Sequence, residues 1–196
     1  MGPHFFGYGS LVNSATHSYH NPRPAYLRGW RRTWRHTHHR KVSFLTAVPC
    51  PQSEIWGVVA EVPNKDWAAL DAREYAYDRH NITDHIFNTD ARPTDTAIYA
   101  IETGGHHAPT DAHPILLSYI DVVLRGYFDL FGDDGIAHFI ATTDGWDAPI
   151  LNDRARPLYP RAQALTKSET AQTDHALMTL SVEVEKLQKA DLAFEI

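Results

Sequence analysis

The chain has 196 residues, a length that fits one domain with a substantial core. Its 43% hydrophobic and 21% charged residues are typical of a soluble globular protein, and a net charge of −6 argues against a bulk nucleic-acid binder. The single cysteine, Cys50, excludes an intrachain disulfide and favours a reducing compartment. No signal peptide is recognisable, and the most apolar stretch, residues 115–124, is too short to span a bilayer. We therefore expect one cytoplasmic domain over residues 1–196, with no membrane partner.

Strands dominate the first half of the chain. Residues 5–8 form an apolar run that ends at Gly9, and residues 13–24 have the composition of a loop. Further strands are expected at residues 25–37, 42–48, 55–62, 78–88 and 96–102, two of them bounded by Pro49, Pro51 and Pro63. Between these strands, Asn64 is expected to cap a short helix that carries Trp67, Leu70, Asp71 and Glu74 on one face.

Helices dominate the second half. The apolar spacing predicts a helix over residues 114–131, stopped by Gly132, and a shorter one over residues 134–142. Residues 144–161 are irregular, and a capping box from Thr166 to Glu169 opens a third helix that runs to about Leu180. A short strand is expected over residues 182–185. This order predicts an α+β fold, a small mixed sheet or partly closed barrel flanked by helices.

The first candidate site is the turn formed by Tyr8, Gly9, Ser10 and Leu11. Glycines permit positive φ angles that turn successive N–H groups toward one point, which makes an anion-binding concavity. The alternative is a strand that simply needs a tight turn. Val12 stands where a dinucleotide fingerprint or a serine nucleophile elbow would need glycine, so neither motif matches.

The second candidate is Glu74. It shares its predicted helix face with Trp67 and Leu70, and Tyr75 and Tyr77 follow it closely enough to exclude water. A carboxyl group in such a pocket has its pKa raised from about 4.3, as general acid–base catalysis requires. The neighbouring arginines, Arg73 and Arg79, suit either an ion pair with Glu74 or a substrate carboxylate. The alternative is a solvent-exposed glutamate near a helix end.

Two other clusters favour ordinary structural roles. His36, His38 and His39 resemble part of a metal site, because His36 and His38 would share one face of a strand. No third ligand for that pair is placed by spacing, so a solvated strand edge is the simpler interpretation. Residues 23–41 contain no acidic side chain and place Trp30 and Trp34 among arginines, a pattern seen in nucleic-acid-binding strands. An amphipathic strand whose tryptophans pack inward explains this pattern better, so we expect neither a metal nor a nucleic-acid partner.

Together these motifs resemble the γ-glutamylcyclotransferase family. The family's strand followed by Tyr-Gly-Ser is matched by Tyr8-Gly9-Ser10-Leu11, and its Leu-Asp-x-x-Glu helix by Leu70-Asp71-Ala72-Arg73-Glu74 with Tyr77 three residues on. The resemblance covers about residues 5–100, including the strand around Gly57. The segments Asn152-Asp153-Arg154 and Tyr159-Pro160-Arg161 are similar to a bacterial subset of the family. Tyr75 stands where the family often has glycine, which would narrow the pocket.

The resemblance implies a γ-glutamylcyclotransferase fold and an enzyme that releases 5-oxoproline from a γ-glutamyl substrate. It implies that Glu74 is the general acid–base and that Tyr8, Gly9, Ser10, Leu11 and Tyr77 bind the substrate, with no metal or organic cofactor. Two alternatives stay open: a non-catalytic binding protein of the same fold, and a γ-glutamyl deacylase of a biosynthetic pathway. The sequence does not choose among glutathione, γ-glutamyl dipeptides and γ-glutamylamines, and it leaves the oligomeric state open.

Overall fold

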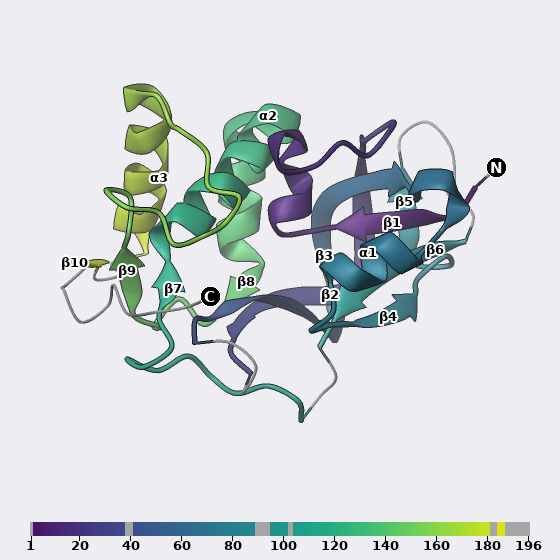
Figure 1. Ribbon diagram of the computed structural model, residues 1–196, viewed down its shortest axis with the longest axis horizontal. Coiled ribbons are helices and arrows are strands. Elements are labelled where there is room, and N and C mark those ends of the chain that lie inside the picture. Colours follow the sequence, from purple (N-terminus) through teal and green to yellow (C-terminus); the bar gives the residue numbers. More distant parts are fainter. Residues whose placement is uncertain (1, 38–40, 89–94, 102–103, 181–183, 187–196) are drawn as a thin grey trace.

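The computed structural model describes residues 2–37, 41–88, 95–101, 104–180 and 184–186 and shows the expected α+β architecture, with a strongly curved sheet and three α-helices (Figure 1). The strands are β1 His4–Gly7, β2 Arg23–Arg35, β3 Phe44–Glu61, β4 Asp78–Asn81, β5 Ile86–Asn88, β6 Thr96–Ala100, β7 Ile115–Leu116, β8 Thr143–Asp144, β9 Ile150–Asn152 and β10 Val184–Lys186. The helices are α1 Ala68–Arg73, α2 Leu117–Ala141 and α3 Lys167–Thr179, and the 3₁₀ turns are η1 Ser10–Val12, η2 Ser14–Thr16 and η3 Pro63–Lys65.

The main sheet has the strand order β4-β6-β1-β3-β2-β5, and β8 also pairs with β2. Strand β1 lies inside this sheet, antiparallel to β3 and parallel to β6. The chain that leaves β1 therefore emerges from the middle of the sheet, and η1 lies beside α2 (Figure 1). A smaller sheet, β10-β9-β7, lies near α3 on the other side of α2. This arrangement places the turn at residues 8–11 between the sheet and the long helix.

The expected strands at residues 42–48 and 55–62 form one long strand, β3, so the prediction that Pro49 and Pro51 end a strand is wrong. Strand β3 pairs with β2 along most of its length, and the register shifts between Arg28 and Trp30, where Gly29 has φ = 82°. The prolines lie opposite or next to this irregularity, on an exposed part of the ribbon. Proline is tolerated where a bulge already interrupts the hydrogen-bond ladder.

Two further predictions differ in detail from the structure. The expected strand over residues 78–88 is two strands, β4 and β5, which lie at opposite edges of the main sheet. Asn64 does not cap α1: it lies in η3 with φ = 53°, and the helix starts at Ala68, whose N–H is accepted by the Asp66 carboxylate at 2.9 Å. Asn64 has a left-handed backbone conformation and lies inside η3, so it does not begin the helix.

The helices of the second half agree more closely with expectation. The segments predicted at residues 114–131 and 134–142 are joined in α2, with a kink at Gly132, where φ is 65° and ψ is −153°. Thr166 and Glu169 form the expected capping box at the start of α3. Strand β10 includes part of the last predicted strand, whose residues 182 and 183 lie outside the described residues. No helix in the described part of the chain is long and apolar enough to cross a membrane.

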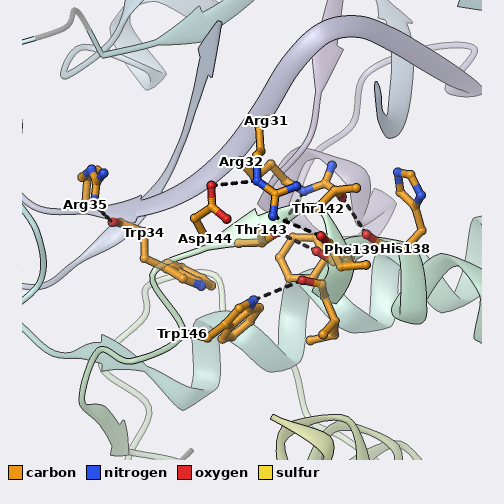
Figure 2. Close-up of polar contacts among 12 residues, drawn as sticks. Arg31, Arg32, Trp34, Arg35, His138, Phe139, Thr142, Thr143, Asp144 and Trp146 are labelled. Atoms are coloured by element: carbon orange, nitrogen blue, oxygen red, sulfur yellow. Dashed lines mark hydrogen bonds and ion pairs between the residues drawn. The ribbon is translucent and has the colours of Figure 1, made fainter. Parts of the chain in front are cut away.

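The interior contains a charged side chain that the sequence did not predict to be buried, Arg32. Trp34 is fully buried, which confirms that this strand turns a tryptophan inward, but Arg32 is fully buried as well. Its guanidinium donates to Thr143 Oγ1 at 3.2 Å, Thr142 Oγ1 at 2.5 Å, Trp56 O at 3.0 Å and Tyr127 Oη at 3.1 Å. Figure 2 shows this guanidinium directed at the threonines that follow α2, while Arg31 pairs with Asp144 nearby. Arg32 therefore fastens β2 to the end of the long helix.

His138 of α2 lies at the edge of this cluster (Figure 2). Its ring stacks on Trp56, with the centroids 4.2 Å apart and an interplanar angle of 11°. Burial, followed by the charge of Arg32, lowers the pKa of His138 to about 4. In the unfolded chain this group titrates near 6.5. The unfolded state therefore binds a proton that the folded state excludes as the pH falls from about 6.5 to 4, so stability is lost over that window.

We expect His138→Phe, which keeps the stacked ring but removes the titrating group, to lose less stability than the wild type over this pH range. Urea unfolding at about pH 7 and about pH 5 measures the difference. His17 and His106, whose pKa values are also lowered by burial, are present in both proteins and cancel in the comparison. Parallel stability curves for the two proteins would contradict this prediction.

Candidate active site

The turn that follows β1 is held by hydrogen bonds of its own backbone. The Val12 N–H donates to Gly9 O at 3.0 Å and the Asn13 N–H donates to Ser10 O at 3.2 Å. The Tyr8 hydroxyl donates to Tyr99 O at 2.6 Å, so the turn is also attached to β6. These contacts give the residues from Tyr8 to Leu11 one defined conformation.

Gly9 has φ = −115°, so the expected positive φ in this turn is wrong. The glycines instead allow close approach of neighbouring groups. A Cβ atom on Gly9 would lie 2.8 Å from the Tyr119 hydroxyl, and one on Gly7 would lie 2.7 Å from the Leu11 Cβ atom. Contacts this short are not tolerated by a close-packed interior, so both positions require glycine for space rather than for backbone freedom.

Glu74 is placed by the end of α1. Its N–H donates to Leu70 O at 2.9 Å and its carbonyl accepts the Tyr77 N–H at 2.8 Å, so the side chain leaves a tight helix end. The side chain is only 17% exposed, and the Arg73 Nε atom donates to Glu74 Oε1 at 3.0 Å. The arginine thus keeps a cation beside the carboxylate and orients it.

Glu74 and the turn border one small cavity of about 40 Å³, which we call the inner cavity. It is lined by Phe6, Gly7, Tyr8, Gly9, Ser10, Leu11, Leu45, Glu74, Tyr77, Tyr99 and Tyr119. All six residues that the sequence nominated for catalysis or substrate binding are in this set. The structure therefore brings together two motifs that lie some sixty residues apart in the chain.

The aromatic residues around Glu74 differ from expectation at one position. Tyr77 is partly buried, donates its hydroxyl to Leu45 O at 2.9 Å and contacts the Phe44 ring edge-on. Tyr75, which we expected to exclude water, is 66% exposed, because the chain turns outward directly after α1. Tyr77, Tyr99 and Tyr119 border the inner cavity in its place.

Sequence reasoning missed Tyr119, which comes from the first turn of α2. Its hydroxyl lies against the turn, since a Cβ atom on Gly9 would lie 2.8 Å from it. Burial raises the pKa of Tyr119 well above its ordinary value, and nearby Tyr159, Tyr8 and Glu74 raise it further, so this hydroxyl stays neutral at physiological pH. A single tyrosine on an apolar helix carries no motif, so only the folded structure could identify it.

Tyr119 also borders a second, larger cavity of about 330 Å³, which we call the outer pocket. Its lining comes from the start of β3, the end of α1, the start of α2 and the irregular segment before α3. The lining residues are Val42, Ser43, Phe44, Ala72, Arg73, Tyr75, Leu116, Tyr119, Tyr159, Pro160 and Arg161. One tyrosine thus stands between a small cavity with a carboxylate and a larger one with two arginines.

Asp153 holds the segment of residues 152–161 in position. Its carboxylate is fully buried and contacts the first turn of α2. Its oxygens accept the Ser118 N–H at 2.8 Å, the Ser118 hydroxyl at 2.6 Å and the Leu158 N–H at 2.8 Å. A carboxylate at a helix N-terminus is stabilised by the free N–H groups there. Through Leu158, this contact fixes the wall of the outer pocket formed by the next three residues.

The neighbouring Arg154 attaches the same segment to both helices. Its guanidinium makes two hydrogen bonds of 2.7 Å to the Asp121 carboxylate of α2 and one of 2.6 Å to Asp174 of α3. Although burial opposes it, these carboxylates raise the pKa of Arg154 above its ordinary value. The segment for which the sequence suggested no chemistry is therefore a rigid part of the site's surroundings.

His36 does not border either cavity. His36 pairs through its backbone with His107, and its ring stacks on His113 with the centroids 3.9 Å apart. His38 and His39 lie outside the described residues. Within the parts of the chain that the structure describes, no group of three or more His, Cys, Asp or Glu side chains is arranged to hold a metal ion.

Comparisons with known proteins bear on the family and the fold of the chain. A family model described as ChaC-like protein matches residues 4–187, whereas the curated proteins give no match. A solved structure of a γ-glutamyl cyclotransferase is similar with a TM-score of 0.58 at 12% identity, covering 88% of this chain and 98% of that chain. The human protein loc79017 gives a TM-score of 0.57 at 14% identity, with coverages of 87% and 97%.

YkqA from Bacillus subtilis is similar with a TM-score of 0.55 at 17% identity, covering 73% of this chain and 56% of that one. At these identities the structural likeness establishes the fold, while the family model extends over most of the sequence. The chain therefore belongs to the ChaC-like protein family, and its fold is that of the γ-glutamyl cyclotransferases.

Proposed function

We propose that the protein is a γ-glutamylcyclotransferase, which converts a γ-glutamyl amide into 5-oxoproline and a free amine or amino acid. The observation that carries this proposal is that the Glu74 carboxylate and the Tyr8–Leu11 turn border the same inner cavity. Membership of the ChaC-like family and the fold support the same reaction class.

The substrate of this reaction carries its own nucleophile. The α-amine attacks the γ-carbonyl carbon, a C–N bond forms within the five-membered ring, and the bond from that carbon to the leaving nitrogen breaks. Holding the two groups together converts the attack into an intramolecular step, which removes several kcal/mol of the barrier. The enzyme therefore needs neither a covalent nucleophile nor a cofactor for the bond exchange.

Glu74 serves the proton transfers in this mechanism. The amine must lose a proton to attack, and the leaving nitrogen must gain one to depart as a neutral amine. Glu74 accepts the first proton and returns it in the second step, so it ends the cycle in its starting state. The Arg73 contact, at 3.0 Å, orients the carboxylate for these transfers.

The turn after β1 binds the γ-glutamyl group of the substrate. Backbone N–H groups between Tyr8 and Leu11 bind either the α-carboxylate or the carbonyl oxygen, on which negative charge develops during attack. The neutral Tyr119 hydroxyl lies beside the same turn and borders the same cavity. A substrate oxygen that carries negative charge forms the stronger hydrogen bonds with these N–H donors.

Two alternatives differ in what they leave behind. A non-catalytic binding protein of this fold would bind γ-glutamyl compounds but release no 5-oxoproline. A γ-glutamyl deacylase would use the same ring closure, with Glu74 in the same role, on the γ-glutamyl derivative of a biosynthetic intermediate. A panel of γ-glutamyl amides assayed for 5-oxoproline distinguishes the enzyme from the binding protein. The leaving amine that gives the highest rate distinguishes the cyclotransferase from the deacylase.

We expect Glu74→Gln to abolish most turnover, because glutamine keeps the shape of the side chain but neither accepts nor returns a proton. The loss should reach at least the ~10²–10⁴-fold typical of general acid–base groups. The measurement is kcat/KM for 5-oxoproline release, with 5-oxoproline binding measured in parallel.

The matched control for this substitution is Glu54→Gln, which removes an exposed glutamate paired with Arg28 on the β2–β3 ribbon. It should keep near-wild-type turnover. Activity of Glu74→Gln within a few-fold of the wild type, with the protein folded, would reject the assignment of Glu74.

We expect Gly9→Ala to lower turnover by about 10²-fold, because its methyl group would displace the Tyr119 hydroxyl and shift the turn that holds the substrate. Ser10→Ala should retain a measurable fraction of activity, since the turn acts through its backbone. Both variants are compared by kcat/KM and by thermal unfolding. The assignment of the turn fails if Ser10→Ala is the more damaging change, or if Gly9→Ala is as active as the wild type.

A further inference from the structure

A leaving group attached to the substrate must extend beyond the inner cavity, whose volume of about 40 Å³ accommodates only a small group. The outer pocket shares Tyr119 with that cavity and offers about 330 Å³, within the range of small-molecule sites. Arg73 borders the outer pocket and contacts Glu74, which borders the inner cavity. The two cavities are therefore neighbours, and the outer pocket is the space available to the leaving group.

The outer pocket has a basic lining. Two arginines, Arg73 and Arg161, border it, and none of the lining residues is acidic. Arg73 is paired with the Glu74 carboxylate, so Arg161 is the member whose charge is available to an anionic ligand. A guanidinium binds a carboxylate through two parallel hydrogen bonds.

Arg73 is the buried member of this pair. Its side chain is 10% exposed, and its Nε atom is engaged by Glu74. Its Nη2 atom is buried and has no hydrogen-bond partner among the described residues. Because this atom is shielded from solvent, Arg73 adds positive charge to the wall of the pocket, and the donors that reach a ligand belong to Arg161.

Arg161 is the exposed member, and its position is fixed by the backbone. The Ala162 N–H donates to Tyr159 O at 3.0 Å, which closes a turn with Pro160 and Arg161 at its centre. The Tyr159 ring packs edge-on against Tyr119 with the centroids 4.9 Å apart. The Arg161 guanidinium makes no hydrogen bond or ion pair with any residue that the structure describes, so it is free to bind a ligand.

We propose that the outer pocket is a leaving-group subsite in which Arg161 binds a carboxylate of the leaving group, with the charge of Arg73 nearby. The inference rests on the proposed cyclotransferase function and narrows it: the enzyme prefers γ-glutamyl amino acids or peptides to γ-glutamylamines, and Arg161 is the residue that sets this preference. The carboxylate comes either from the residue attached to the γ-glutamyl group or from the next residue of a peptide.

The experiment compares substrates that differ only in this carboxylate. γ-Glutamylalanine is paired with γ-glutamylethylamide, which lacks the carboxyl group of alanine. γ-Glutamylalanylglycine is paired with its C-terminal amide, which tests a carboxylate one residue further out. The measured quantity is the ratio of kcat/KM within each pair, for the wild type, for Arg161→Met and for Arg156→Met. Arg156 is an exposed arginine of the same segment that does not border the pocket and serves as the matched control.

We expect the wild type to prefer the carboxylate in at least one pair by about tenfold or more, the effect of a hydrogen bond to a charged group. Arg161→Met should remove most of this preference while γ-glutamylethylamide turnover stays within about twofold, and Arg156→Met should leave the preference unchanged. The pair that shows the effect identifies which carboxylate is bound. Arg73 is left intact because it also contacts Glu74.

The outcomes separate this inference from the function on which it rests. If no substrate releases 5-oxoproline, the proposed function is wrong and the subsite falls with it. If 5-oxoproline forms but neither pair shows a preference, or if Arg161→Met slows both members of a pair equally, the cyclotransferase function stands and the subsite is rejected.

Discussion

The buried guanidinium of Arg32 is the contact on which the arrangement of the site depends. It is fully buried, and among the described residues its hydrogen-bond partners are neutral oxygens of β3, of α2 and of the threonines after α2. The Tyr127 hydroxyl accepts one of these bonds and lies 2.7 Å from Trp56 O and 3.0 Å from Tyr8 O, so it has a carbonyl of the turn within reach for donation. Burial lowers the pKa of Arg32, yet a guanidinium remains charged, so every one of these oxygens is held in place by the cost of leaving a buried cation unsatisfied.

Helix α2 is consequently fixed at both ends. Asp153 binds its first turn through Ser118, while Arg32 holds the threonines that follow its last turn. Between these points the helix meets the turn after β1 twice, through Tyr127 at Tyr8 O and through the Tyr119 hydroxyl beside Gly9. A helix free to slide by one residue would move Tyr119 relative to Glu74, so these terminal contacts stabilise the separation of the two cavities as well as the fold.

The features that the sequence predicted are local. The turn after β1 and the helix end at Glu74 are short patterns of residue type and spacing, and the capping box of α3 is another. The failures have long-range causes. Pro49 and Pro51 continue a strand because a bulge in the partner strand accommodates them, and Arg32 turns inward because Thr142 and Thr143, more than a hundred residues away, supply acceptors. Tyr119 carries no signal in its own neighbourhood and meets the site only through tertiary contacts. The Tyr159-Pro160-Arg161 motif is visible in the sequence, but which cavity it borders is decided by the packing of its turn against α2.

In the proposed enzyme, the residues that catalyse ring closure and the residues that select the leaving group also come from different parts of the chain. The inner cavity is built from β1, its turn and the end of α1, the parts of the chain that carry the family resemblance, and it provides what ring closure requires: a proton acceptor and N–H donors. The outer pocket adds the start of α2 and the segment before α3, which Asp153 and Arg154 hold in place. Because ring closure takes place entirely within the γ-glutamyl group, residues 152–161 can differ between enzymes of this fold without disturbing the reacting atoms. The choice of leaving group is therefore decided by the wall of the outer pocket, and the two motifs that identify the chemistry carry no information about it.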